Sequence, residues 1–443
     1  MADTVESFTW LFRYLEHFDN AFWSYVGPAI ILLAGGYFTI KTKGYQFHTL
    51  RYIIVHLRDL FSETSNMDGP GTHPFKLYFA SVGGAVGLTN VVSVVAAVTI
   101  GGPGGLVWVW ITALAGMLVK YCEIYLGIIH RVRNRHGGYD GGPMYYLQAA
   151  FNNRFFPLLI GILICVYTTD VSQFLIMTDT LSESFAWHHL TVTLCLLALV
   201  LAVAKIGMRL VAYLSLLLMP PFLLTYIILC TWVIGLHADA LWELLPQIFI
   251  SAFEGHAPLG GFAGSTIWMA AQYGTSRAVY SGDIGIGFDA TVQSESRVQD
   301  AGKQARLAVF ALANDMIICT LTCLLVLSTG LWTNSSLEPS QYVTHALQLH
   351  FPHASWFMTV LLFVTGFINI VTFLTIGFKS ARFIHAKYGE HVFVLYSMIA
   401  FIFFSFYEQD EVILVMSASS GMLLMVNMLG IIKLRKQIVF RPQ

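Results

Sequence analysis

The sequence has few charged side chains. Lysine, arginine, aspartate and glutamate together make up 11% of the 443 residues, whereas soluble domains carry roughly 25%. Hydrophobic residues reach 56%, and the mean hydropathy is +0.67. This composition excludes an ordinary soluble domain and predicts an all-α, polytopic membrane protein surrounded by the lipid bilayer. The formal net charge is −1, so no basic excess indicates a nucleic-acid partner.

Cysteine is also scarce. The six cysteines all fall in apolar segments, which is typical of small buried side chains and not of a disulfide or zinc framework. The sequence has no H-E-x-x-H motif, no G-x-S-x-G motif and no histidines at metal-ligand spacing. We therefore expect neither an enzyme nor a bound cofactor. The acidic N-terminal segment lacks the positive region and the cleavage site of a cleaved signal peptide.

What the sequence does contain is a long apolar run broken by glycine, at residues 81–105. Gly83, Gly84 and Gly87 interrupt the run, and Asn90 follows. Glycine costs about 1 kcal/mol in a helix interior relative to alanine, and Asn90 is polar at membrane depth. An unwound helix lining a cavity explains both features, because its free backbone groups can bind a cation and a carboxylate. The alternative is that these glycines only permit close helix packing.

A second glycine-broken segment, PLGGFAGST, occupies residues 258–266. Two interrupted spans, one in each half of a chain, indicate the binding site of a secondary transporter. The second segment therefore favours the unwound helix over simple packing.

Eleven spans are predicted. The first is an extra span, and the other ten form two halves of five spans each. An odd number of spans per half requires the two halves to be inverted relative to each other. The predicted divisions are an N-terminal segment 1–75, a first repeat 76–236, a second repeat 237–433 and a tail 434–443. The spans lie at about 22–40, 76–99, 106–130, 156–180, 190–204, 209–236, 250–274, 306–331, 355–380, 391–407 and 411–433.

The distribution of basic residues predicts the orientation in a plasma membrane of the bacterial inner-membrane type. Lysine and arginine gather in alternate loops and in the C-terminal tail, whereas the intervening loops are almost free of them. The positive-inside rule then places the N-terminus outside and the C-terminus in the cytoplasm. Residues 45–61 show apolar positions at helical spacing with Arg51 and Arg58 among them, which predicts an amphipathic helix on the cytoplasmic face.

Several motifs resemble the alanine/glycine:cation symporter family, the sodium:alanine symporters of the APC superfamily. The segment GGPGGLVWVWITALAGMLVKYCE at 101–123 is similar to the family signature. GGPMYYL at 141–147 and GGFAG at 260–264 resemble two further family motifs, and Asp315 stands where the family carries an aspartate. The resemblance covers the chain from about residue 71. The resemblance implies a LeuT-like fold and a protein that imports alanine or glycine by Na⁺-coupled symport.

The sequence departs from the family pattern at three places. Leu88 and Thr89 replace the middle pair of the usual G-T-G-N, and Asp283 stands in place of a glutamate. Residues 374–379 differ from the family's usual run at the end of that span. These departures leave the substrate and the ion stoichiometry open.

The resemblance and the broken spans together predict the substrate site. A zwitterionic amino acid needs donors for its carboxylate and acceptors for its ammonium group, and the two broken helices of a LeuT-like transporter supply them. Asn90 could instead make an interhelical hydrogen bond, and Phe262 could be ordinary core packing. Gln173 aligns with a substrate-facing glutamine of the family. The predicted substrate site comprises Gly87, Leu88, Thr89, Asn90, Gln173, Gly260, Gly261, Phe262, Gly264 and Ser265.

A sodium site is predicted next to the first broken helix. Na⁺ needs hard oxygen ligands, and carbonyls of the unwound segment could provide some of them. Thr365, Asn369 and Thr372 share one face of the span 355–380, which completes a sodium site in this superfamily. Threonine hydroxyls in spanning helices more commonly bond to their own backbone, which is the alternative here. The predicted ligands are Gly84, Ala85, Val86, Thr365, Asn369 and Thr372.

Five ionisable residues are predicted to serve gating or coupling. Lys120 and Glu123 are spaced to pair with each other near the cytoplasmic end of their helix. Asp283 is a candidate inner-gate residue, or part of a solvated loop. Asp170 is either functional within the membrane or solvated at the outer mouth of its span. Asp315 or Asp170 would carry the proton if the protein were proton-coupled.

The sequence thus predicts Na⁺-coupled symport of a small neutral amino acid by alternating access. One alternative keeps this fold but uses protons or a different amino acid. A membrane-embedded enzyme lacks a motif to support it. A channel is disfavoured because no single helix carries a repeated polar stripe.

Overall fold

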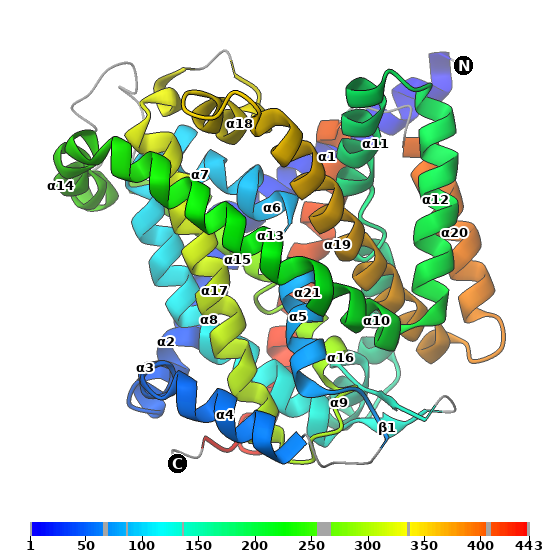
Figure 1. The fold of residues 1–443 in the computed structure, drawn as a ribbon. Helices are drawn as coiled ribbons and strands as arrows, with labels where there is room; N and C mark the ends of the chain where they lie inside the picture. The colour runs from blue at the N-terminus through cyan, green and yellow to red at the C-terminus, as the bar shows by residue number, and fades with distance from the viewer. Residues whose placement is uncertain are drawn as a thin grey trace.

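The computed structural model describes residues 2–64, 70–85, 87–134, 137–254, 267–334, 337–404 and 409–440. Over these residues the chain is a bundle of helices with one two-stranded hairpin. The long helices run between two ends of the molecule, and the two chain termini lie at opposite ends (Figure 1). Apart from the hairpin, the described residues therefore form the all-α architecture that the sequence predicts.

Eight helical segments among the described residues are long and apolar enough to cross a membrane. Of the predicted spans, 76–99 is divided into short helices, 250–274 crosses residues outside the described ranges, and 391–407 corresponds to a shorter helix. The count of eleven therefore remains a prediction. The eight segments are Phe12–Lys41, Gly105–Ile129, Phe155–Ser182, His189–Ile206, Met208–Leu236, Ala301–Ser328, Ala354–Ile384 and Leu414–Leu434.

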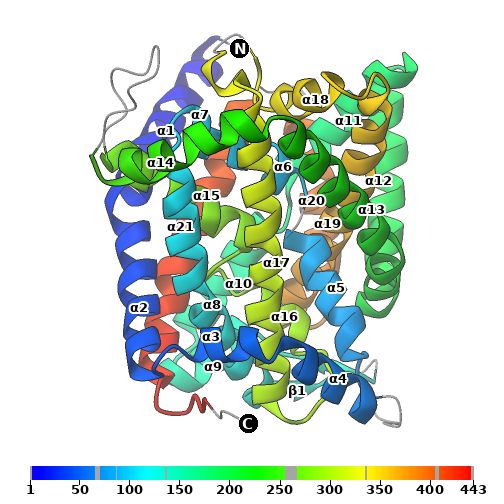
Figure 2. The same ribbon diagram turned by 60° about the vertical axis from the view of Figure 1, so that its left-hand side comes forward.

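The N-terminal segment forms one long helical run followed by two helices across the end of the bundle. Helix α1 (Ala2–Ala21) continues through a π-helical turn η1 (Phe22–Val26) into α2 (Gly27–Lys41). Helices α3 (Tyr45–Arg51) and α4 (Ile53–Thr64) then lie across the lower end (Figure 2). The predicted helix over 45–61 is present, but it is divided at Tyr52.

The first glycine-rich run is broken where the sequence predicts. Helix α5 (Pro74–Ala85) ends at the glycines, and α6 (Leu88–Val91) begins after them. A 3-10 turn η2 (Ser93–Val95) and the short helix α7 (Ala96–Thr99) follow, so the second part is itself irregular. No single regular helix therefore spans residues 76–99.

Helix α8 (Gly105–Ile129) stands at the centre and packs against α2, α15 and α17. The glycines at its start allow close backbone contact. A Cβ atom on Gly104 would lie 2.6 Å from Ala252 Cα, and one on Gly105 would lie 2.9 Å from the carbonyl carbon of Ala97. The G-G-P-G-G segment is thus explained by packing at the crossing of three chain segments.

The predicted span 156–180 is two helices, and this division was missed from the sequence. Helix α10 (Phe155–Tyr167) ends at Thr168, and α11 (Val171–Phe185) begins after Asp170. Asp170 is the N-cap of α11, because its carboxylate accepts the backbone N–H of Gln173 at 3.1 Å. The break falls at the polar residues Thr168, Thr169 and Asp170, and an aspartate followed three residues later by Gln173 is a helix-start signal that the sequence analysis overlooked.

The remaining elements complete the bundle and its two ends. In Figure 1, α14 and α18 lie near the upper end, and the β1–β2 hairpin lies near the lower end. They are β1 (Val132–Arg133), β2 (Tyr139–Asp140), α9 (Pro143–Phe151), α12 (His189–Ile206), α13 (Met208–Leu236), α14 (Ala238–Glu254), α15 (Ile267–Gly282), α16 (Phe288–Gln293), α17 (Ala301–Ser328), η3 (Leu331–Thr333), α18 (Gln341–Gln348), α19 (Ala354–Ile384), α20 (Gly389–Phe404) and α21 (Gln409–Leu434).

Candidate functional site

Asn90 joins the broken first helix to two neighbouring helices. Its side-chain oxygen accepts the backbone N–H of Gly87 at 3.3 Å, and its amide group donates to the Asp315 carboxylate on α17. Ser281 at the end of α15 donates to the other Asp315 oxygen at 3.2 Å. Asn90 is fully buried and Asp315 is 3% exposed. The interhelical hydrogen bond, which was the alternative to a substrate contact, is therefore present, and Asn90 also holds the broken segment through Gly87.

Two amide side chains converge on the same break from the other side. Asn369 on α19 donates its amide hydrogen to the Gly84 carbonyl at the end of α5. A Cβ atom on Gly87 would lie 3.3 Å from Gln173 Oε1 and 3.8 Å from Asn369 Nδ2. Helices α11 and α19 thus place both side chains close to Gly87.

Both amides have a buried oxygen atom without a hydrogen-bond partner among the described residues: Gln173 Oε1 and Asn369 Oδ1. A buried acceptor left unpaired costs about 1–3 kcal/mol, so such atoms need an explanation. An ammonium group or a hard cation would satisfy them. The arrangement can therefore bind a positive group beside the carbonyl of Gly84.

The two threonines of α19 that were predicted as sodium ligands use their hydroxyl hydrogens within their own helix. Thr365 donates to the Leu361 carbonyl at 2.8 Å, and Thr372 donates to the Ile368 carbonyl at 2.6 Å. This is the back-bonding alternative. Their oxygen lone pairs stay available, and the Thr372 methyl group lies 3.4 Å from a Cβ position on Gly84. Thr372 therefore lies at the break.

Asp170 is buried rather than solvated. Its side chain is only 3% exposed, and it accepts hydrogen bonds from the Gln173 backbone at 3.1 Å and from Ser172 Oγ at 3.0 Å. The reading of a solvated group at the mouth of the span is therefore wrong. Asp170 positions Gln173, because it caps the turn from which that side chain projects.

The predicted pairing of Lys120 with Glu123 is also wrong. Lys120 Nζ lies 2.5 Å from Asp289 Oδ2 on α16, and it also donates to the Gly282 carbonyl. Glu123 instead accepts the amide of Asn427 on α21. Lysine and glutamate at this spacing share a helix face, but tertiary partners on the neighbouring elements compete for both side chains.

A buried polar network links α8 to the segment between α15 and α16. Asn427 donates to the Gly285 carbonyl at 2.8 Å and accepts the Tyr146 hydroxyl. Asp283, which has a φ of 46° and is 2% exposed, accepts the Tyr167 hydroxyl at 2.6 Å. Asp283 is thus not part of a solvated loop. Asn427 was missed, although a lone asparagine in an apolar span was a usable signal.

Part of the predicted site lies outside the described residues. This applies to Val86 and to the whole contribution of the second broken segment, namely Gly260, Gly261, Phe262, Gly264 and Ser265. Ala85 is the last residue of α5, and Leu88 and Thr89 begin α6. The described half of the site is therefore the side formed by α5, α6, α11 and α19.

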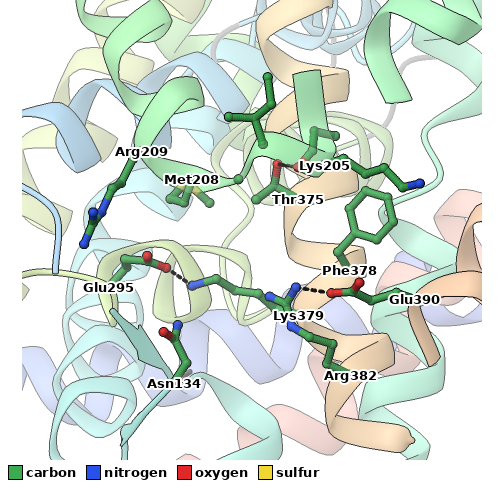
Figure 3. A pocket seen from close by; sticks show the side chains of 13 residues that line it. Asn134, Lys205, Met208, Arg209, Glu295, Thr375, Phe378, Lys379, Arg382 and Glu390 are labelled. Carbon is green, nitrogen blue, oxygen red and sulfur yellow. Dashed lines mark hydrogen bonds and ion pairs between the residues drawn. The ribbon is translucent and has the colours of Figure 1, made fainter. Parts of the chain in front are cut away.

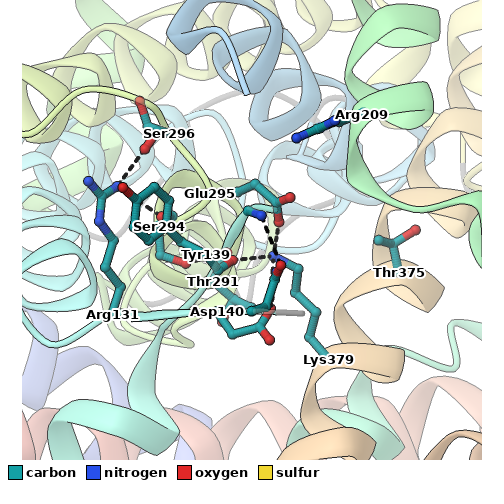
Figure 4. A network of polar contacts seen from close by, with 12 residues as sticks. Arg131, Tyr139, Asp140, Arg209, Thr291, Ser294, Glu295, Ser296, Thr375 and Lys379 are labelled. Carbon is teal, nitrogen blue, oxygen red and sulfur yellow. Dashed lines mark hydrogen bonds and ion pairs between the residues drawn. The ribbon is translucent and has the colours of Figure 1, made fainter. Parts of the chain in front are cut away.

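A separate cavity of about 310 Å³ opens near the lower end of the bundle, and sequence reasoning missed it (Figure 3). The turn between α12 and α13, helix α19 and the loop after α16 line it. Lys379 on α19 contacts Glu295 and lies 3.2 Å from the Tyr139 carbonyl and 3.7 Å from Asp140 (Figure 4).

The same network surrounds Tyr139 on its other side. Arg131 stacks on the Tyr139 ring at 3.9 Å and donates to the Ser296 carbonyl at 2.5 Å. The hydrogen bond from Gln299 and the Arg131 charge lower the pKa of the Tyr139 hydroxyl, while partial burial acts in the opposite direction. The hairpin and the loop after α16 are thus held together through Arg131.

Comparisons with known proteins agree with this architecture. The profile of the sodium:alanine symporter family matches residues 8–441. The chain is 25% identical to a probable sodium/glutamine symporter, GlnT, of Bacillus subtilis over 95% of this chain and 89% of that one. It is 25% identical to the sodium/alanine symporter AgcS of Methanococcus maripaludis over 75% of this chain and 71% of that one.

One solved structure has a similar arrangement of helices. The crystal structure of a manganese transporter from Eremococcus coleocola superposes with a TM-score of 0.53 at 15% identity, covering 80% of this chain and 75% of that one. At this identity the likeness concerns the arrangement of helices alone.

Proposed function

Because the chain belongs to the sodium:alanine symporter family, we propose that it imports a small neutral amino acid, alanine or glycine, together with Na⁺. Family membership itself gives the class of a multi-pass membrane transporter, not an enzyme, that moves an amino acid with a cation. The choice of a small neutral substrate and of Na⁺ is the proposal.

One observation carries the proposal: the two unpaired amide oxygens at the first helix break. Gln173 Oε1 and Asn369 Oδ1 are buried acceptors, and Asn369 also holds the Gly84 carbonyl. An amino acid presents an ammonium group that needs acceptors, and Na⁺ needs several oxygens. We assign Gln173 to the ammonium group and Asn369, with the carbonyls near Gly84, to Na⁺.

The geometry also explains how the two ligands would depend on each other. Asn369 and Gln173 approach Gly87 from different helices, so each ligand orders the same short segment. A segment already ordered by Na⁺ costs the amino acid less to order, and the effect is reciprocal. Na⁺ should therefore raise the affinity for the amino acid, and the amino acid should raise the affinity for Na⁺.

We further propose the LeuT-like arrangement of two inverted repeats, 76–236 and 237–433, after one extra helix. The break between α5 and α6, the likeness to a solved transporter and the placement of the chain ends at opposite ends of the bundle support it. The positive-inside pattern supports an external N-terminus and a cytoplasmic C-terminus in a plasma membrane. The lower end of Figure 2 is then the cytoplasmic end.

In this scheme the network around Lys120 closes the cytoplasmic side below the site. The Lys120–Asp289 ion pair joins α8 to α16, and Asp283 joins the same segment to Tyr167 at the end of α10. Both contacts are buried, so each would have to rearrange when the site opens inward.

Two alternatives keep the fold but change the ligand. Proton coupling would use Asp315, the buried carboxylate in contact with Asn90. A larger amide substrate is suggested by the likeness to the probable sodium/glutamine symporter. We assign the opposite wall of the site to the second broken segment, where Phe262 would limit the size of the substrate side chain.

Uptake into proteoliposomes separates these possibilities. Radiolabelled alanine, glycine and glutamine would be offered with an inward gradient of Na⁺, with choline in its place, and with a pH gradient alone. The proposal expects accumulation of alanine or glycine with Na⁺ only. Uptake that persists in choline and follows the pH gradient would contradict the Na⁺ assignment, and preference for glutamine would contradict the substrate assignment.

A further inference from the structure

The lower cavity has the size and polarity of a binding site for a small molecule. Its volume of about 310 Å³ lies at the lower limit of ligand pockets, which measure about 300–1,000 Å³. Charges of both signs line it. Lys205, Arg209, Lys379 and Arg382 are positive, and Glu295 and Glu390 are negative. Figure 3 shows the Lys379–Glu295 pair below Arg209, and the Arg382–Glu390 pair toward one side.

Lys379 has three acceptors, one for each N–H of its ammonium group. It contacts the Glu295 carboxylate, the Tyr139 carbonyl at 3.2 Å and Asp140 at 3.7 Å. Lys379 is 5% exposed and Glu295 is 7% exposed, so the cluster holds two carboxylates against one buried cation. Glu295 can therefore turn toward another positive group while Lys379 keeps two acceptors.

Arg209 lies at the cavity with donors to spare. Its Nη2 atom donates to the Gly137 carbonyl at 3.1 Å, and the side chain is exposed. An arginine guanidinium has five N–H donors and is suited to a carboxylate. The cavity thus presents a carboxylate, a lysine and an arginine within one small volume.

One face of α19 runs from the candidate site to the cavity. Asn369, Thr372, Thr375 and Lys379 follow each other at steps of three or four residues, which places them on one face of the helix. Asn369 contacts the helix break at Gly84, whereas Thr375 and Lys379 line the cavity. A polar stripe therefore leads from the break to the lower end.

We propose that the lower cavity is a second binding site for a zwitterionic amino acid, in which Glu295 accepts the ammonium group and Lys379 and Arg209 bind the carboxylate. This inference rests on the proposed function, since the ligand is the transported amino acid after it leaves the first site and before it reaches the cytoplasm. Binding replaces the Lys379–Glu295 ion pair by two others: Glu295 with the ammonium group of the ligand, and Lys379 with its carboxylate. No charge is therefore left buried without a partner. The site has no unpaired amide oxygens comparable to those at the break, and it binds its ligand without Na⁺.

Occupation of this site also affects the start of the broken helix. The Lys379–Glu295 pair ties α19 to the loop after α16. The backbone of that loop pairs with Thr72, whose N–H donates to the Glu295 carbonyl at 2.8 Å and whose carbonyl accepts the Arg297 N–H at 3.0 Å. Because Thr72 lies two residues before the start of α5, release of Glu295 from Lys379 removes the connection from this loop to α19.

The test is equilibrium binding of radiolabelled L-alanine and L-glutamine to the purified full chain in choline buffer without Na⁺. We expect saturable binding to one site. Glu295→Gln and Lys379→Met should each weaken it by about tenfold or more, since each removes one charge partner of the zwitterion. Arg209→Gln, at an exposed position where folding is not at stake, should weaken it by about threefold or more.

The exposed His189–Asp179 pair, which is not part of the cavity lining, provides the control. Its side chains are 40% and 42% exposed. The double variant His189→Gln with Asp179→Asn should leave Na⁺-free binding unchanged.

Absence of saturable Na⁺-free binding of both amino acids would overturn the second site, as would binding that Glu295→Gln, Lys379→Met and Arg209→Gln leave unchanged. These results are distinguishable from failure of the proposed function. A protein that accumulates alanine with Na⁺ but shows no Na⁺-free binding contradicts only the second site. A protein with Na⁺-free binding sensitive to Glu295 but no Na⁺-driven uptake contradicts only the symport proposal.

Discussion

Replacement of Asn90 by alanine should strongly destabilise the protein and disorder the first helix break. Asn90 makes three buried contacts, with the Asp315 carboxylate, with the Gly87 N–H and with Cys319 Sγ at 3.4 Å, of which the first two are the stronger. Hydrogen bonds to charged groups contribute about 1.5–3 kcal/mol, and a buried donor left unpaired costs about 1–3 kcal/mol. The free energy of unfolding should therefore fall by about 4 kcal/mol.

Part of this loss should be recovered by neutralising Asp315. In the Asn90→Ala protein, Asp315 keeps only the hydrogen bond from Ser281 at 3.2 Å, while its charge stays buried. Asp315→Asn removes that charge, so the double variant should be more stable than the sum of the single changes predicts, by about 2 kcal/mol.

The assay is equilibrium unfolding in mixed micelles, with the four proteins of the double-mutant cycle compared. Thr365→Val serves as a control, because the Thr365 hydroxyl donates its hydrogen bond to the Leu361 carbonyl of its own helix. That change should cost less than about 1 kcal/mol. Equal stability of Asn90→Ala and the parent protein, or strict additivity with Asp315→Asn, would refute the reasoning.

Three further changes test other parts of the account. Asn369→Ala removes the contact with the Gly84 carbonyl and one unpaired oxygen. The Na⁺ concentration for half-maximal uptake should therefore rise about tenfold. Unchanged Na⁺ activation would contradict the assignment of Asn369 to the sodium site. Phe262→Ala should admit larger neutral amino acids in competition assays, and unaltered selectivity would argue for ordinary packing. Lys120→Met leaves Asp289, which is 1% exposed, without its ion-pair partner. It should lower the free energy of unfolding by about 3–5 kcal/mol, and Asp289→Asn in the same protein should restore part of it in the same unfolding assay.

The sequence was informative wherever local composition determines local structure. The glycines at 83, 84 and 87 predicted a break, and the structure ends α5 at Ala85 and begins α6 at Leu88. The helical periodicity of Thr365, Asn369 and Thr372 placed them on one face, and Asn369 does contact the break. Both inferences depend on short-range geometry, which a single sequence carries.

Features set by tertiary partners could not be predicted. Lys120 pairs with Asp289, which is distant in the sequence, rather than with Glu123 on its own helix. The division of 156–180 at Asp170 was missed for another reason: the polar run Thr168–Asp170 did mark it, but the segment as a whole is long and apolar enough to be taken as one span. The lower cavity depends on how α12, α13 and α19 meet, and no periodicity within one segment encodes that meeting.

The most direct test of Na⁺ symport is to drive the ion with the amino acid. Proteoliposomes would be given radioactive sodium at equal concentration inside and outside, with an inward gradient of alanine or of glycine. The account predicts that sodium accumulates inside, because coupling must act in both directions. It also predicts that Asn369→Ala diminishes the effect. Amino-acid entry without any movement of sodium would contradict Na⁺-coupled symport.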